Sequence, residues 1–235
     1  MNPQPPHLEL TGSNLPYFEP ARPRVLAHRG LALEAPENSL LAFAHALAVG
    51  VTHLETDVHA SADGVAVIAH DPDLSRVAGR PQRVDQLTAA ELARLDLGAE
   101  QHLPTLAETL DAFPDARFNI DLKSVGAVAS AVEAVRAAHA VDRVLLTSFS
   151  ERRRRAAVAQ LPGVATSASG PRFAAALLAT VVRGGPLVRA VLRGLHAVQI
   201  PVRAISLDTV SPARIRAFHA AGVEVHVWTI NEQPE

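Results

Sequence analysis

The sequence predicts an α/β fold of the TIM type, a (β/α)8 barrel that lacks its last β/α unit. Three observations indicate this fold. Short apolar runs alternate with longer alanine-rich stretches, as parallel strands alternate with helices. Nearly all of the seven candidate parallel strands end in polar residues or residues common in catalysis, and the chemistry of such barrels lies at that end of the strands. One further apolar run follows its neighbour too closely for a parallel crossover, which predicts a β-hairpin inserted after the second strand.

The composition is that of one large soluble domain. The chain has 235 residues, of which 48% are hydrophobic and 20% charged, and its net charge is −2. This length is sufficient for a substantial buried core. Because proteins that bind nucleic acids usually carry a basic excess, we expect no nucleic-acid partner. The chain has no cysteine, which excludes disulfides and thiolate metal sites.

The N-terminal residues are rich in proline and polar side chains. We expect an extended segment over 1–23 and a single barrel domain over 24–235. A basic start followed by an apolar core is absent there, so the sequence predicts no secretory signal and a cytoplasmic location. The apolar stretch from Phe173 to Leu195 is interrupted after about ten residues, well short of the ~20 that span a bilayer. It predicts a helix, a break and a second helix, with contact to a membrane surface as the alternative.

The limits of the individual elements follow from the spacing of the apolar residues and from the capping residues and glycines between them. Strands are expected at 25–27, 53–58, 65–69, 117–122, 144–148, 164–168, 197–201 and 223–229. Helices are expected at 39–49, 89–95, 106–112, 125–139, 151–160, 173–183 and 212–221. Asn38, Thr88 and Ser211 stand where N-caps belong, and Gly50 and Gly222 stand where helices end.

The hairpin brings a histidine back to the carboxylates. Only seven residues, VHASADG, separate Asp57 from Val65, so the two runs pair antiparallel. A turn near residues 61–64 sets His70 beside Glu55, within the tolerance of one or two residues that loop length leaves.

The chain stops at WTINEQPE, where an eighth strand and helix are expected. An unclosed barrel exposes sheet edges and apolar surface, which invites association. The sequence therefore leaves three alternatives open: a truncated product, self-association through the open edge, or a rearranged barrel.

Chemistry-bearing residues cluster at four strand ends. VLAHRG, LETDV, VIAHD and FNIDLK supply, in order, His28 and Arg29; Glu55 and Asp57; His70; and Asp121 and Lys123. Three carboxylates from two strands are hard oxygen ligands, and they suit one divalent cation, Mg²⁺ or Ca²⁺. The same carboxylates could equally form an ion network with Arg29 and Lys123.

The histidines favour the metal alternative. An imidazole gives or takes a proton near neutral pH, so two of them beside a cation supply an acid and a base for a displacement. Arg29 offers a planar fork suited to phosphate oxygens, whereas Lys123 offers a point charge.

The segment AHRG…APENSLL…HLETDVHASADG…IAHD resembles the glycerophosphodiester phosphodiesterase family. The resemblance extends over residues 24–150 and returns at AAGVEVHVWTIN. It implies a phospholipase-C-like barrel that hydrolyses glycerophosphodiesters to sn-glycerol 3-phosphate and an alcohol, with a place in lipid metabolism. It further implies that His28 and His70 are the acid–base pair, and that Glu55, Asp57 and Asp121 are the metal ligands.

The resemblance also implies supporting and substrate-binding roles. Arg29 and Lys123 would bind phosphate, Phe149 would line the pocket, and Trp228 would form a wall for the glycerol moiety. Glu37 would hold Arg29, and Asn38 would cap the following helix. Many members have glutamate at the position of Asp121, so the cation would sit differently here or take an added water.

Other functions stay open at this point. A related phosphodiesterase that acts on lysophospholipids or sphingolipids would use the same residues. A barrel that cannot close would serve as a binding module without turnover. A metal-dependent amidohydrolase fits less well, because its first strand wants His-x-His and this one reads His-Arg-Gly.

Overall fold

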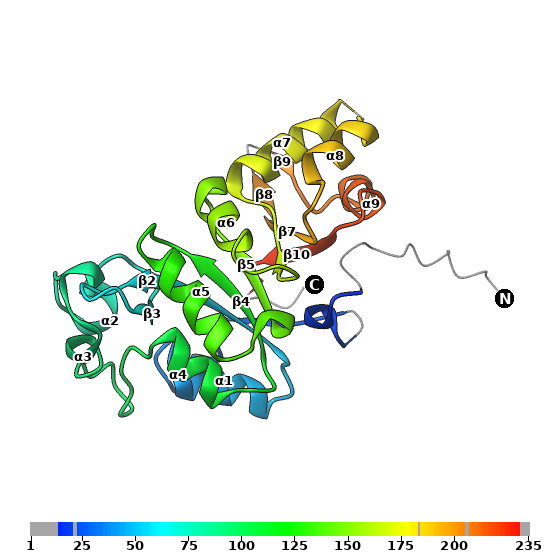
Figure 1. Ribbon diagram of the computed structural model, residues 1–235. Coiled ribbons are helices and arrows are strands. Elements are labelled where there is room, and N and C mark those ends of the chain that lie inside the picture. Colours follow the sequence, from blue (N-terminus) through cyan, green and yellow to red (C-terminus); the bar gives the residue numbers. More distant parts are fainter. Residues whose placement is uncertain (1–13, 21–22, 183, 205–206, 231–235) are drawn as a thin grey trace. The chain divides into compact units, whose positions relative to one another are not determined.

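The computed structural model describes residues 14–20, 23–182, 184–204 and 207–230 (Figure 1). The chain divides into two compact units. The first is Pro20–Val164, and the second is Ala165–Glu235 together with Met1–Glu19. Each unit has its own strands, helices and hydrophobic core, and each is described by itself below.

The first unit is built on a parallel sheet. Its strands lie in the order β1 (Leu26–His28), β2 (His53–Ala60), β4 (Arg117–Leu122) and β5 (Val144–Thr147). All three neighbouring pairs are parallel. The long helices between and after these strands are α1 (Leu40–Ala48), α4 (Leu106–Ala112), α5 (Ala127–Ala137) and α6 (Glu151–Val158). Since strand alternates with helix, parallel pairing is the expected result.

The core of the first unit forms between this sheet and its helices. Leu54 on β2 and Ile120 on β4 are fully buried. Phe43 of α1 packs edge-to-face against Phe118 of β4, with ring centroids 5.9 Å apart. Contacts of this kind add to the free energy gained by burying the rings, because each positive ring edge meets a negative ring face.

The predicted hairpin is confirmed. Strand β3 (Ala66–Ile68) pairs antiparallel with β2, with Val58 opposite Ile68. This register differs by one residue from the expected one, within the slip that loop length allows. The Ala69 N–H donates to the Asp57 carbonyl at 3.0 Å, so the pairing continues to the residue before His70.

Short elements surround the hairpin. They are α2 (Ser75–Ala78), a 3-10 turn η2 (Val84–Gln86) and α3 (Ala89–Leu92). A further 3-10 turn, η3 (Val141–Arg143), lies directly before β5. Thr88 caps α3, as predicted, in a reciprocal capping box with Glu91. Helix α3 ends three residues before the predicted limit at 95, and α2 was not predicted. Its four residues are too few to show a helical period.

The second unit contains the remaining strands of the predicted series. Strands β7 (Ala197–Pro201) and β10 (Glu224–Trp228) pair in parallel, and a bridge from Ser167 to Ala197 joins the end of β6 (Ala165–Thr166) to β7. Helices α7 (Gly170–Val181), α8 (Gly185–Leu192) and α9 (Pro212–Ala220) belong to this unit. The predicted helix, break and second helix are thus confirmed. A two-residue hairpin of β8 (Arg203–Ala204) and β9 (Leu207–Asp208) was not predicted.

Part of the N-terminal segment belongs to the second unit. Within residues 1–23, Pro16–Phe18 form a 3-10 turn, η1, and Tyr17 and Phe18 are buried. The Phe18 ring lies 6.5 Å from the His196 ring and 6.4 Å from the His226 ring. Residues 1–13 and 21–22 lie outside the described residues, and the domain limits at 23 and 24 stay predictions.

All seven predicted parallel strands are present, as β1, β2, β4, β5, β6, β7 and β10. The predicted absence of a last β/α unit concerns the chain after residue 230, outside the described residues. No helix of the described part of the chain is long and apolar enough to cross a membrane.

Candidate active site

The register of the parallel sheet brings the predicted site residues of the first unit to one edge. His28 at the end of β1 is paired with Glu55 of β2, and Asp57 is paired with Asp121 of β4. Since neighbouring parallel strands end at the same edge, groups far apart in sequence meet there. Asp57 and Asp121 are both buried, with exposed fractions of 2% and 6%.

Arg29 stands at a sharp turn directly after β1. Its φ is 57°, and the φ of Gly30 is 82°, so two successive residues adopt the left-handed region. The turn aims the Arg29 backbone N–H at Glu55 Oε2, 3.2 Å away. The guanidinium donates from Nη1 to Glu37 Oε1 at 3.0 Å and lies with Nε 3.3 Å from Asp57 Oδ2. The predicted contact between Glu37 and Arg29 is therefore present, and two of the three guanidinium nitrogens face carboxylates.

Lys123 lies between two carboxylates. Its Nζ is 2.9 Å from Asp57 Oδ1 and 2.8 Å from Asp121 Oδ2, and 5.8 Å from the centre of the Phe149 ring. Burial alone would lower the pKa of Lys123, but the negative charges of Asp57 and Asp121 outweigh it and raise the pKa. The lysine therefore stays charged at the strand edge.

Glu55 is the least compensated of the three carboxyl groups. Its pKa is raised well above the ordinary value, first by burial and then by the charges of Asp57 and Asp121, although Lys123 and Arg29 oppose the shift. A further positive charge beside Glu55 would lower this pKa again, because it stabilises the carboxylate. The charged form of Glu55 is thus disfavoured in this site unless a further positive charge lies beside it.

One carboxylate oxygen of the site lacks a protein donor. Asp121 Oδ1 is buried and accepts no hydrogen bond from the described residues. A buried oxygen without a partner is costly unless water or an ion meets it. No group of three or more acidic or histidine side chains among the described residues is arranged as an ion-binding cluster. Instead, the Lys123 ammonium occupies the space between Asp57 and Asp121. The donor set fits a hard cation by its chemistry, because it offers three carboxyl groups, one of them a Glu55 whose charged form needs further positive charge, and this oxygen of Asp121.

His28 is the more accessible of the groups around Glu55. Its side chain is 37% exposed, and its Nε2 lies 3.9 Å from Glu55 Oε2. The pKa of His28 is lowered from its ordinary value by burial and by the positive charge of Arg29. His28 is therefore neutral at pH 7 and able to accept a proton.

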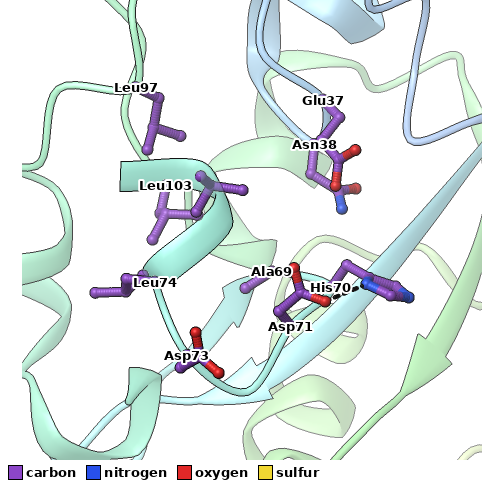
Figure 2. Close-up of a pocket in the computed structure, with 10 residues that line it drawn as sticks. Glu37, Asn38, Ala69, His70, Asp71, Asp73, Leu74, Leu97 and Leu103 are labelled. Carbon is purple, nitrogen blue, oxygen red and sulfur yellow. Dashed lines mark hydrogen bonds and ion pairs between the residues drawn. The ribbon is translucent and has the colours of Figure 1, made fainter. Parts of the chain in front are cut away.

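His70 is held by the residue that follows it. Its Nδ1 lies 2.8 Å from Asp71 Oδ1 (Figure 2). Because a carboxylate only accepts, Nδ1 donates in this hydrogen bond, and the bond fixes the orientation of the ring. The His70 backbone carbonyl lies 3.2 Å from His59 Nε2. Figure 2 shows Asp71 and His70 on the segment after β3, with Glu37 and Asn38 on the neighbouring segment.

Arg76 connects these two segments, and sequence reasoning missed it. Its Nε donates to Asp71 Oδ2 and its Nη2 to Glu37 Oε1, both at 2.6 Å. A continuous series of ion pairs thus runs from Arg29 through Glu37 and Arg76 to Asp71, and a hydrogen bond continues it to His70. The arginine lies six residues after His70 on the short helix α2, where neither period nor motif marks it.

Asn38 has a role different from the predicted one. The N-cap of α1 is Ser39, whose hydroxyl accepts from the Ala42 N–H at 3.2 Å. Asn38 itself has a φ of 59°, which places it outside the capping geometry. Its amide nitrogen lies 3.4 Å from Asp57 Oδ2, and its carbonyl accepts from the Thr56 hydroxyl at 2.8 Å. Asn38 thus orients a carboxylate of the site, and the predicted cap was wrong.

Comparison with known protein families assigns the chain to one of them. The glycerophosphoryl diester phosphodiesterase family matches residues 28–235, which is most of the chain. The chain belongs to this family. It is accordingly a phosphodiesterase, as the resemblance in its sequence implies.

Relatives and a solved structure agree with the phosphodiesterase assignment. The chain is 42% identical over 209 residues to the Mycobacterium tuberculosis protein named "Probable glycerophosphodiester phosphodiesterase 2", covering 88% of this chain and 79% of the relative. A rat lysophospholipase D is 36% identical over 113 residues, covering 43% of this chain and 36% of the relative. An Oleispira antarctica phosphodiesterase, solved in complex with the product sn-glycerol-3-phosphate, has a TM-score of 0.72 and 28% identity, covering 89% of this chain and 85% of that one.

The fold prediction is confirmed at the level of class. The phosphodiesterase has the α/β fold of the TIM-barrel type that its structural relatives share. The remaining predicted site residue, Trp228, is the last residue of β10 in the second unit, and its exposed fraction is 40%. Its position at a carboxyl strand end agrees with the prediction, and its contact with glycerol stays a prediction.

Proposed function

We propose that this phosphodiesterase hydrolyses glycerophosphodiesters to sn-glycerol 3-phosphate and an alcohol, with a divalent cation as cofactor. One observation carries the proposal. His28, Glu55, Asp57 and Asp121 stand at paired positions on three adjacent strands, and the hairpin returns the chain to Asp57 immediately before His70. The product bound to the Oleispira antarctica relative supports the choice of substrate.

The two histidines have different surroundings, which suggests different roles. His28, with its lowered pKa, accepts the proton of the attacking hydroxyl, which is either water or the neighbouring glycerol hydroxyl. In the second case the displacement forms a cyclic phosphate, and water opens it in a second displacement to give sn-glycerol 3-phosphate. His70, oriented through its Nδ1 by Asp71, offers Nε2 to the leaving alkoxide and protonates it. Such acid–base catalysis contributes about 10²–10⁴-fold per group.

Glu55, Asp57 and Asp121 would hold the cation, Mg²⁺ or Ca²⁺. When bound, the cation supplies positive charge that stabilises the charge developing on the phosphate oxygens. Lys123 lies against Asp57 and Asp121, so its ammonium adds positive charge beside the proposed cation ligands. Arg29 holds Asp57 and Glu37, so its contribution includes the orientation of a proposed cation ligand.

The substrate walls are proposed from two aromatic residues. Phe149 is 61% exposed beside Lys123, which suits a residue that lines an open pocket. Trp228 is proposed to contact the glycerol moiety. It is the only tryptophan of the chain. Saturating sn-glycerol 3-phosphate should therefore change the intrinsic fluorescence, and unchanged emission at a concentration that inhibits turnover would exclude this contact.

The activity test is release of sn-glycerol 3-phosphate from glycerophosphocholine. We expect release by the native chain and a loss of at least about 100-fold in kcat for His28→Ala and for His70→Ala. His45→Ala on α1 is the matched control, because it removes an imidazole from a helix that carries no site residue. Near-native turnover by either site variant would refute the role of that histidine. No release from the folded chain under any metal condition would refute the function and favour a binding module.

A second candidate substrate is lysophosphatidylcholine. The observation in its favour is the similarity to the rat lysophospholipase D. Release of choline can be measured from both substrates and decides between them. A higher kcat/KM for lysophosphatidylcholine than for glycerophosphocholine would assign the lysophospholipid as the substrate. A sphingolipid substrate, self-association through an open sheet edge and a cytoplasmic location stay predictions.

A further inference from the structure

The charges of the chain are unevenly distributed along its sequence. Residues 152–207 contain nine arginines and no aspartate, glutamate or lysine, whereas the chain as a whole has a net charge of −2. Helices α7 and α8 lie within this acid-free segment. Every charged side chain that these two helices carry is therefore an arginine.

The same helices expose aliphatic side chains where they join. Leu178, Val181, Val182 and Leu187 have exposed fractions of 55%, 52%, 69% and 51%. The first three are spaced i, i+3 and i+4, so they share one face of the last turn of α7. A Cβ on Gly184 would lie 3.2 Å from Leu187 Cβ and 3.6 Å from Val182 Cγ2, which places these two side chains on either side of the turn. We call these four residues the aliphatic tip (Figure 1, α7 and α8).

The tip is distinct from the residues that form the core. Ala176, Leu177 and Ala179 of α7, and Val188 and Leu192 of α8, are the buried residues of the two helices. The helices thus satisfy their packing with one face and leave a second apolar face in solvent. Aliphatic side chains gathered in this way, rather than scattered singly, usually mark a binding surface.

Two exposed arginines lie beyond the tip. Arg189 is on α8, two residues after Leu187, and Arg193 directly follows the end of the helix. Arg172 of α7 donates from Nη2 to the Arg193 carbonyl at 3.1 Å, so it links the start of α7 to the residue that follows α8. Guanidinium groups bind phosphate oxygens in bidentate geometry.

We propose that the α7–α8 helical pair docks on the surface of an anionic lipid bilayer, with the aliphatic tip among the acyl chains and Arg189 and Arg193 at the lipid phosphates. The combination distinguishes a bilayer from other partners. A nucleic acid would match the arginines but has no apolar layer for four aliphatic side chains. A second copy of the chain would cover the aliphatic side chains, but it would set arginine against arginine. An anionic bilayer accepts both parts of the surface.

The test is co-sedimentation of the full chain with vesicles. We expect binding to vesicles of phosphatidylcholine and phosphatidylglycerol, and little binding to phosphatidylcholine alone. Raising NaCl from about 0.05 to about 0.5 M should weaken it, because the Debye length shortens about threefold. The double variant Arg189→Gln/Arg193→Gln should bind about 25-fold more weakly, since each basic residue near such a surface contributes about fivefold. Val181→Ser/Val182→Ser should lose binding about tenfold or more.

Matched controls lie in the first unit. Val49→Ser, at a residue 68% exposed, and Arg94→Gln, also exposed, change the same side-chain types away from α7 and α8. Both should bind vesicles like the native chain, and all variants should keep the native thermal midpoint. Native binding by the tip variants, or equal losses in the controls, would overturn the proposal. Absence of vesicle binding by the native chain would overturn it as well. If the native chain then formed a dimer that Val181→Ser/Val182→Ser dissociates, the occupant of the tip would be a second copy of the chain. These measurements involve no turnover, so they stand independently of the proposed reaction.

Discussion

Individual charges in the phosphodiesterase site are held by partners on other segments. Glu37 Oε1 lies 3.0 Å from Arg29 Nη1 and 2.6 Å from Arg76 Nη2, so one oxygen serves two arginines. Burial alone would raise the pKa of Glu37, but the hydrogen bond from Arg76 and the charges of both arginines lower it. Arg76 thus links the residue that holds Arg29 to the residue that holds His70.

Replacing Arg76 by glutamine should impair catalysis more than folding. Its side chain is 49% exposed, and ion pairs of that kind contribute only about 0–1 kcal/mol to stability. The loss of orientation at His70 should lower kcat about tenfold, because small displacements of a catalytic group are costly. The measurement is kcat and KM on glycerophosphocholine. KM should stay within about twofold, since the acid acts mainly in the transition state.

The control for this prediction is Arg83→Gln. Arg83 pairs with Asp85 at 2.9 Å in the same unit, and its side chain is 50% exposed. We expect native kcat there and partial recovery in Arg76→Lys. Asp71→Asn combined with Arg76→Gln should lose less than the product of the two single losses, because both act through His70. Native kcat in Arg76→Gln would show that Asp71 orients His70 without help.

The lowered pKa of His28 predicts the pH dependence of the reaction. A base must be neutral, and burial together with the Arg29 charge keeps His28 neutral to lower pH than the ordinary value of 6.5. The acidic limb of kcat/KM should therefore fall below pH 6.5. In Arg29→Gln, which loses one of the causes that lower this pKa, the limb should move to higher pH. A native acidic limb above pH 6.5 would contradict the role of His28 as base.

Residues at strand ends were predictable, whereas residues that hold them were not. His28, Glu55, Asp57 and Asp121 are found from the sequence because an apolar run that ends in polar side chains marks the edge of a sheet. Arg76 has no such mark, since its partners Glu37 and Asp71 lie 39 and 5 residues away. Asn38 follows the pattern of a cap, but its φ of 59° aims its amide at Asp57 and Thr56 instead.

At the scale of elements, the close approach of β1 and α1 is set by one glycine. Gly30 has a φ of 82°, and a Cβ there would meet the Ala42 carbonyl carbon at 2.7 Å. The turn that aims Arg29 therefore requires both a left-handed backbone and an absent side chain. The sequence motif HRG has this glycine for a geometrical reason.

Gly30→Ala should destabilise the fold by about 2–5 kcal/mol, the combined cost of a left-handed alanine and of overpacking. Gly64→Ala is the control. Its φ is 79° in the β2–β3 turn, but nothing lies within 4 Å of the added Cβ. It should cost only about 1–2 kcal/mol. Urea unfolding of both variants measures the difference, and equal losses would show that the contact with Ala42 relaxes without cost.

Long elements were predicted well and short ones poorly. Strands β4 and β7 have the predicted limits, because each is a full apolar run bounded by turn residues. The four-residue α2 and the hairpin of β8 and β9, with two residues per strand, were missed. Elements of that length bury too few side chains to leave a periodic pattern.

At the scale of the whole molecule, the sheet concentrates negative charge that the chain compensates only in part. Lys123 lies against both Asp57 and Asp121, yet the pKa of Glu55 remains raised and Asp121 Oδ1 remains without a donor among the described residues. The sequence predicted the carboxylates and favoured a divalent cation over an ion network. The structure has the ion network, with chemistry at Glu55 and Asp121 that suits a cation as well.

Chelation separates these two alternatives. EDTA should abolish turnover, and Mg²⁺ or Ca²⁺ should restore it. The reason is that the pKa of Glu55 stays raised despite Lys123 and Arg29, so its carboxylate requires further positive charge. The thermal midpoint should rise when the ion is added, since a ligand that binds only the folded state stabilises it. Asp121→Asn should lose both effects, whereas Asp121→Glu, which keeps the charge, should retain them in part. Turnover and a thermal midpoint that are both indifferent to EDTA and to Asp121→Asn would leave Lys123 as the cation of the site.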